Sequence, residues 1–210
     1  MVYNVLVVED DLRHQANAHH QLKDLNLVVV GDYDAATKEI VGNGLSLPQR
    51  KFDVLLTGLL MPLGHHDIIH DLEKWEPIIK AYGYPLAFVA AAHHIPYIAV
   101  VSDLDHHQDP MSSAMDLFKT RDGLPRRIPT NGSLVMFFDI RDLPDIYSLQ
   151  DGTTTDICPY HLEEEKRDQY FAFSVLELHP ELEGTPAQDK MFYRQAKNWK
   201  AALEMLVEQV

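Results

Sequence analysis

Residues 3–8 read YNVLVV, an apolar run rich in valine, and residues 9–11 close it with the charged triplet EDD. An uninterrupted apolar run that ends in charge is typical of a strand buried on both faces of a parallel sheet. A helical pattern begins at Leu12, and either Asp10 or Asp11 is placed to cap it. This stretch therefore predicts an α/β fold built from parallel strands.

The alternation of strands and helices continues along the chain. Further strands are expected at 27–30 (LVVV), 53–57 (DVLLT), 97–102 (YIAVVS) and 134–138 (LVMFF). Helices are expected over 12–24, 34–41 (capped by Asp34), 67–82, 85–94 and 110–118, a loop over 123–131, an irregular insertion over about 140–189, and a closing amphipathic helix over about 191–209. We therefore expect a single elaborated domain over 1–210, an α/β fold with a five-stranded parallel sheet of the flavodoxin type and helices on both faces.

Composition excludes several classes of function. The 210 residues carry a formal net charge of -14, and Arg126–Arg127 is the densest pair of arginines, so binding to nucleic acid is not expected. The longest apolar stretch, residues 85–101, is interrupted by histidines and a proline, so no membrane span is expected. Cys158 is the single cysteine, and the chain enters a strand without a leader segment. These features predict a cytoplasmic protein.

Polar side chains follow the strands at the points where they end. Glu9 and Asp10 follow the first strand, Ser102 and Asp103 lie at the end of the fourth, and Asp139 follows the fifth. The carboxyl ends of parallel strands share one sheet edge, where ligands bind in open α/β folds. Clustered carboxylates repel one another unless a cation lies among them, and Mg²⁺ prefers oxygen ligands. The alternative is that these carboxylates cap helices and face solvent.

Three motifs resemble the receiver domain of two-component response regulators. They are VLVVEDD at 5–11, DVLLTGLLMP at 53–62 and AVVSD at 99–103. The resemblance implies a CheY-like fold, a Mg²⁺ site at the acidic pair Glu9 and Asp10, and a switch hydroxyl at Ser102. It also implies a phosphoacceptor aspartate four residues before Pro62 and a lysine at the end of the fifth strand.

The chain departs from the receiver pattern at both chemically essential positions. The phosphoacceptor position is Gly58, and the spacing from Gly132 places Asp139 where the family has its lysine. Glycine offers no nucleophilic oxygen, and an aspartate cannot supply the positive charge that phosphoryl transfer requires. The sequence therefore predicts a degenerate pseudo-receiver that is not phosphorylated on aspartate.

Twelve histidines are present, several of them in adjacent pairs. His65–His66 and His106–His107 follow the third and fourth strands, so they can lie above the acidic edge and bind Zn²⁺ or Mn²⁺ with its carboxylates. The alternative is that they are surface imidazoles that bind nothing. His19–His20 and His93–His94 lie inside expected helices and are interpreted as structural.

Asp105–His106–His107 also resembles the Asp-His-His signature of Mn²⁺-dependent phosphoesterases, with Asp103 as a further carboxylate. In that family the tripeptide lies in a two-metal site that activates water. The N-terminal acidic motif of that family is missing here, and a polar loop after the fourth strand is the simpler interpretation.

Three functions from different classes remain open at this point. The leading one is a regulatory or interaction module that binds a protein partner or forms a homodimer and has no catalytic activity. The second is a metal-dependent hydrolase that uses Asp103, Asp105, His106 and His107. The third is a non-catalytic protein that binds a cation or a small ligand at the same sheet edge.

Overall fold

A computed structural model describes residues 2–42, 51–64, 79–103, 110–148, 154–156 and 195–207. Its centre is a six-stranded sheet with the order β2-β1-β3-β6-β8-β7. The strands are β1 (Asn4–Val8), β2 (Asn26–Val30), β3 (Val54–Gly58), β6 (Tyr97–Ser102), β7 (Ile128–Thr130) and β8 (Ser133–Asp139). All pairs are parallel except β7 with β8. The predicted fold class is confirmed, with one antiparallel edge strand added.

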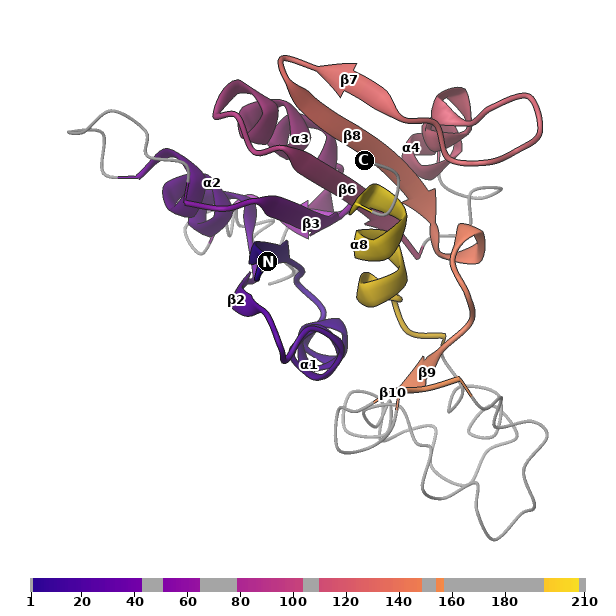
Figure 1. The fold of residues 1–210 in the computed structure, drawn as a ribbon, viewed down its shortest axis with the longest axis horizontal. Helices are drawn as coiled ribbons and strands as arrows, with labels where there is room; N and C mark the ends of the chain where they lie inside the picture. Colours follow the sequence, from indigo (N-terminus) through magenta and orange to yellow (C-terminus); the bar gives the residue numbers. More distant parts are fainter. Residues whose placement is uncertain are drawn as a thin grey trace, which may run out of the picture.

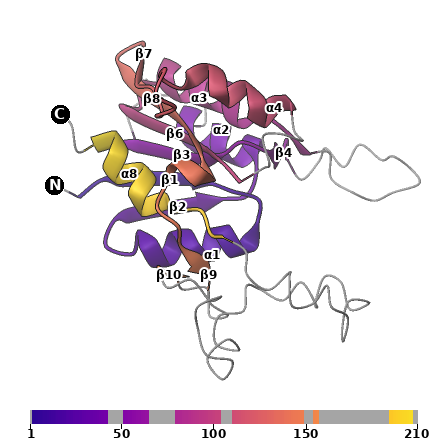
Figure 2. The same ribbon diagram turned by 90° about the vertical axis from the view of Figure 1, so that its right-hand side faces the viewer.

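Helices cover both faces of this sheet (Figures 1 and 2). One face carries α2 (Tyr33–Val41), α3 (Gly83–Ala92), α4 (Pro110–Ser113) and the 3₁₀ helix η1 (Ala114–Phe118). The other carries α1 (Leu12–Gln21) and α8 (Trp199–Val207). None of the described helices has the length and apolarity needed to cross a membrane.

Strand β1 shows why its sequence is apolar without alternation. Leu6 and Val8 pack in the core beneath α2 and α3, whereas Val5 and Val7 pack in the core beneath α1 and α8. All four side chains are fully buried. A strand with a core on each face needs apolar side chains at every position.

The antiparallel strand β7 lies within residues 123–131, where the sequence analysis predicted a loop. Asn131 and Gly132 both have positive φ angles, 49° and 80°, and they join β7 to β8 in a two-residue turn. Asn-Gly is the pair most typical of such hairpins. Pro129 lies in β7, and proline is tolerated there because an edge strand has one side free of ladder bonds.

Smaller elements differ from the prediction in three places. Asp32, and not Asp34, is the N-cap of α2, since its carboxylate accepts a hydrogen bond from the Ala35 amide at 2.7 Å. Ile79–Lys80 forms strand β5 with β4 (Met61–Pro62), so the helix predicted over 67–82 is wrong at this end, while residues 67–78 lie outside the described ranges. The region expected to be irregular contains the 3₁₀ helix η2 (Ile140–Asp142) and the pair β9 (Tyr147–Ser148) and β10 (Thr154–Thr155).

The C-terminal segment approaches α8 in an extended form. Gln195 bridges to Tyr147, and the Ala196 amide donates to the Ile146 carbonyl at 2.8 Å. Helix α8 begins only at Trp199, because Asn198 caps it by accepting a hydrogen bond from the Ala201 amide at 3.0 Å. Because α8 begins only at Trp199, the residues before it are extended and lie against the segment around Ile146 and Tyr147.

Trp199 anchors α8 to the sheet. Its side chain is fully buried, and its indole N–H donates to the His14 carbonyl of α1 at 3.1 Å. We expect Trp199→Ala to lower the free energy of unfolding by about 3–5 kcal/mol, because a large buried aromatic side chain and its hydrogen bond are lost. Lys200→Ala, at an exposed neighbouring position, should change it by less than about 0.5 kcal/mol. Urea unfolding followed by circular dichroism measures both, and equal losses would contradict this role for Trp199.

Candidate functional site

The carboxyl ends of β1, β3 and β6 meet at one edge, as the sequence predicted. Glu9 follows β1, Gly58 ends β3, Ser102 ends β6 and Asp103 follows it. Glu9 and Ser102 are both buried, whereas the Asp103 side chain remains 35% exposed. These residues form an acidic cluster that is buried at Glu9 and Ser102 and reaches solvent at Asp103, and we call the space between Glu9, Gly58 and Asp103 the recess.

Lys197 fills this recess with its own ammonium group. The Nζ atom donates to Glu9 Oε2 at 2.6 Å and lies 3.3 Å from Asp103 Oδ1. Only 3% of its side chain is exposed, and the ammonium also lies 5.7 Å from the centre of the Trp199 ring. The buried Glu9 and Lys197 stabilise one another here, since each alone would be costly to desolvate, and the partly exposed Asp103 adds a second negative charge.

Backbone contacts hold Lys197 in place. Its carbonyl accepts a hydrogen bond from the Gln21 side chain of α1 at 3.0 Å, and its amide lies 3.4 Å from His14 Nδ1. The extended segment before α8 is thus fixed between α1 and the sheet edge, and the Lys197 side chain points inward.

Gly58 leaves the space that the ion pair occupies. A Cβ atom at this position would lie 3.0 Å from Glu9 Oε2 and 3.3 Å from Lys197 Nζ. Both distances are shorter than ordinary van der Waals contact. A side chain at residue 58 therefore requires the ends of the Glu9 and Lys197 side chains to shift, and a longer side chain competes with them for space.

Burial dominates the protonation of this cluster. It raises the pKa of Glu9 to about 7, although the Lys197 ammonium acts in the opposite direction. Burial alone would lower the pKa of Lys197, but Asp103 and Glu9 hold that pKa above its ordinary value. Burial would raise the pKa of Asp103, but Lys197 and His14 hold it well below its usual range. Lys197 and Asp103 are therefore the permanently charged members, and Glu9 titrates near neutrality.

Two basic side chains of α1 complete the surroundings of Asp103. His14 is fully buried, and its Nε2 lies 3.1 Å from Asp103 Oδ2 and 2.7 Å from a guanidinium nitrogen of Arg13. One ring nitrogen cannot donate to Asp103 and accept from Arg13 at the same time. Burial lowers the pKa of His14 to about 4, with Asp103 opposing and Lys197 and Arg13 reinforcing the shift. His14 is therefore neutral at neutral pH.

Asp139 lies at the end of β8 in register with Ser102, but it serves a local structural role. It caps η2, and its carboxylate accepts two hydrogen bonds from the Arg141 guanidinium, at 2.8 and 2.6 Å. The ammonium at the ends of β1, β3 and β6 belongs to Lys197.

Several predicted site residues cannot be placed. Those that lie outside the described ranges are Asp105 and the pairs His65–His66 and His106–His107. Among the residues that the structure does describe, no three histidine, cysteine or acidic side chains are arranged to hold a metal ion. Asp10 borders the recess, and burial raises its pKa. The predicted divalent cation at Glu9 and Asp10 stays a prediction, and the recess does not fit one while Lys197 engages Glu9 and Asp103.

Comparisons with known proteins add little to this description. No protein-family model and no curated protein matches the sequence. A solved structure that matches is that of the phosphorylated cyanobacterial phytochrome response regulator RcpA. The match has 19% sequence identity and a TM-score of 0.32, and it covers 54% of this chain and 74% of that chain. A likeness of this extent identifies neither a family nor an activity.

Removing the ammonium should leave an uncompensated buried carboxylate. We expect Lys197→Met to lower the free energy of unfolding by about 3–5 kcal/mol at about pH 8, and by less at about pH 5.5. The folded-state pKa of Glu9 already lies above its ordinary value, so its stabilising contribution is present at low pH and is lost as pH rises through about 7. Without Lys197 that pKa rises further, and the loss grows with pH.

Two controls accompany this measurement by urea unfolding. Lys200→Met removes an exposed lysine three residues further along and should have little effect at either pH. Adding Glu9→Gln to Lys197→Met should recover most of the stability at high pH, because no buried charge then remains on Glu9. A loss of equal size at both pH values would contradict the ion pair.

Proposed function

We propose that this chain is a receiver-like regulatory module that acts through protein contacts and is not phosphorylated on aspartate. The parallel strand order β2-β1-β3-β6-β8 and the acidic recess at the strand ends support the receiver-like part of the proposal. Gly58 supports the absence of phosphorylation, since it provides no nucleophile. The partner is a second protein or a second copy of this chain.

The observation that carries the proposal is the position of Lys197 Nζ. It lies within 3.3 Å of Asp103, within 2.6 Å of Glu9 and within 3.3 Å of the point where a residue 58 side chain would begin. An incoming phosphoryl group and its Mg²⁺ would need this same volume. The ammonium takes the place of the cation that carboxylates at such an edge require.

With Lys197 in the recess, we infer that this part of the protein adopts one conformation and does not switch between two. In phosphorylation-dependent switches, a new charge orders or releases a segment and shifts a two-state equilibrium. Here the compensating charge is covalently part of the chain and deeply buried. We infer that the module presents a constant surface, and that regulation comes from its abundance or its partner and not from a phosphoryl group.

Beryllofluoride, a mimic of an aspartyl phosphate, gives a direct test. We expect the backbone amide resonances of Glu9, Gly58 and Ser102 to remain unchanged when beryllofluoride and Mg²⁺ are added, because the recess lacks the acceptor and is filled. Two-dimensional nuclear magnetic resonance spectra of the isotopically labelled protein provide the measurement. Saturable shifts confined to these residues would overturn the proposal.

Restoring the acceptor alone should not restore the chemistry. We expect Gly58→Asp to remain unlabelled by radioactive acetyl phosphate with Mg²⁺, because its side chain competes with the Glu9–Lys197 pair for space. Gly31→Asp places a carboxylate directly after strand β2, which β1 separates from β3, and serves as the control for unspecific labelling. Acid-labile, hydroxylamine-sensitive label on Gly58→Asp alone would mean an intact receiver site that lacks one group.

A further inference from the structure

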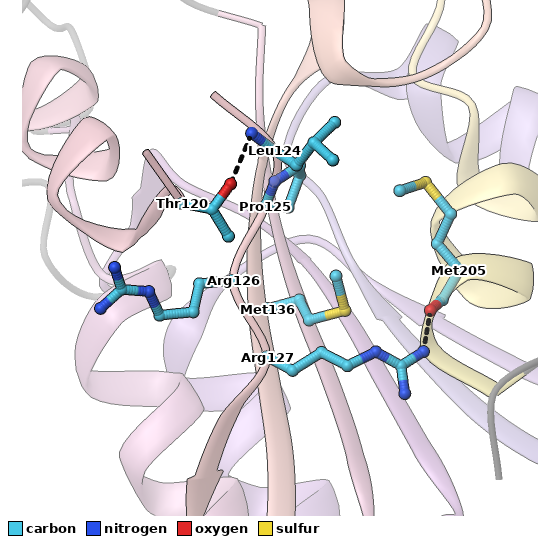
Figure 3. A pocket seen from close by; sticks show the side chains of 7 residues that line it. All are labelled: Thr120, Leu124, Pro125, Arg126, Arg127, Met136 and Met205. Carbon is cyan, nitrogen blue, oxygen red and sulfur yellow. Dashed lines mark hydrogen bonds between the residues drawn. The ribbon is translucent and has the colours of Figure 1, made fainter. Parts of the chain in front are cut away.

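A second concave site lies on the other side of the sheet edge, away from Lys197. It is a pocket of about 420 Å³ between the segment leading into β7, strand β8 and helix α8 (Figure 3). Its apolar lining consists of Leu124, Pro125, Met136 and Met205. This volume falls within the range of about 300–1,000 Å³ that is typical of ligand sites.

The lining consists of a hydrogen-bonded loop on one side and two methionine side chains on the other. The Thr120 amide donates to the Leu124 carbonyl at 2.7 Å, and the Leu124 amide donates to the Thr120 hydroxyl at 3.1 Å, so this loop is closed on itself. Met136 is almost completely buried and Met205 is half-buried. Methionine side chains adjust to apolar partners of different shape, so this pocket suits an aliphatic side chain.

Leu124 is an apolar residue at the rim of the pocket that is largely exposed to solvent. It is 63% exposed although it lines the pocket. A ligand that fills the pocket would bury Leu124, and the burial of apolar surface would stabilise the complex.

Two arginines flank the pocket on an otherwise acidic protein, and their guanidinium groups extend to opposite sides of the chain (Figure 3). Arg126 is exposed, and one of its guanidinium nitrogens lies 3.3 Å from the Lys119 carbonyl. Arg127 donates to the Met205 carbonyl near the end of α8 at 2.6 Å. Within the ranges that the structure describes, neither guanidinium is paired with a carboxylate. Each has five N–H donors, so most of them remain available for an acidic ligand.

The total charge decides among the possible occupants. The chain carries a net charge of -14, so a nucleic acid or a second copy of the chain would be repelled over most of its surface. A short segment with one or two carboxylates meets the two arginines locally and little of the remaining field.

We propose that this pocket binds a short acidic peptide segment of a partner protein, with one aliphatic or methionine side chain in the pocket and carboxylates on either side of that residue, one toward Arg126 and one toward Arg127. The inference rests on the proposed role as a protein-interaction module and names the chemistry of its partner. It does not depend on the recess around Lys197.

Fluorescence polarisation with labelled decapeptides tests the proposal on the full chain. The probes carry a central leucine, methionine or phenylalanine flanked by aspartate and glutamate. At least one probe is expected to bind with a Kd below about 1 mM, and alanine in place of its central residue should weaken binding at least about tenfold. A matched probe with lysine in place of the acidic residues should not bind.

Variants on the protein locate the binding. Arg126→Glu and Leu124→Asp, both at exposed side chains, should weaken binding at least about tenfold. Arg121→Glu makes the same change of charge at an exposed position of the same loop outside the pocket lining, and it should leave binding within about twofold.

The outcomes separate this inference from the proposed function. If no probe binds, or if Arg121→Glu and Arg126→Glu weaken binding equally, the pocket inference fails while the filled recess stands. If a decaribonucleotide binds and Arg126→Glu abolishes this, the arginines recognise phosphate and the inference is overturned. Beryllofluoride binding at Gly58 would overturn the proposed function alone.

Discussion

The ion pair between Lys197 and the carboxylates of Glu9 and Asp103 is the interaction on which the arrangement of the sheet edge depends. It joins the first strand, the fourth parallel strand β6 and the C-terminal segment at a single buried point. Gly58 leaves room for this geometry, because a Cβ atom there would lie 3.0 Å from Glu9 Oε2. This geometry also depends on the extended backbone before α8. The bridge at Gln195 and the helix cap at Asn198 keep Lys197 outside the helix, and its side chain then enters the recess.

Pattern reasoning succeeded where both faces of an element are buried. The ends of the five parallel strands were predicted within about two residues. Apolar runs such as Val5 to Val8 are typical of strands that are buried on both faces of a sheet. It failed at β7, where Pro129 was interpreted as a break in a loop although Asn131–Gly132 is a strong hairpin signal. At this position Asn131–Gly132 predicts the hairpin correctly, whereas Pro129 alone suggests a loop.

The recess was predicted in outline, but its cation was not. Strand ends placed Glu9 and Asp103 together, and their mutual repulsion called for a positive charge. Lys197 was not among the predicted site residues, because the closing helix was expected over about 191–209 and includes it. Asn198 before Trp199 is a helix-start signal that would have put Lys197 outside the helix. Which side chain fills the recess still depends on a contact that spans most of the chain, and local periodicity cannot reveal such contacts.

That long span has a consequence for how the chain acquires its structure. Glu9 and Lys197 are 188 positions apart, so the Lys197 ammonium cannot compensate Glu9 until the chain has been synthesised through residue 197. Contacts of high sequence separation are slow to form, and nascent chains fold from the N-terminus first. Until Lys197 is present, Glu9 and Asp103 lack the ammonium that compensates them, and one face of the sheet lacks Trp199 and the rest of α8.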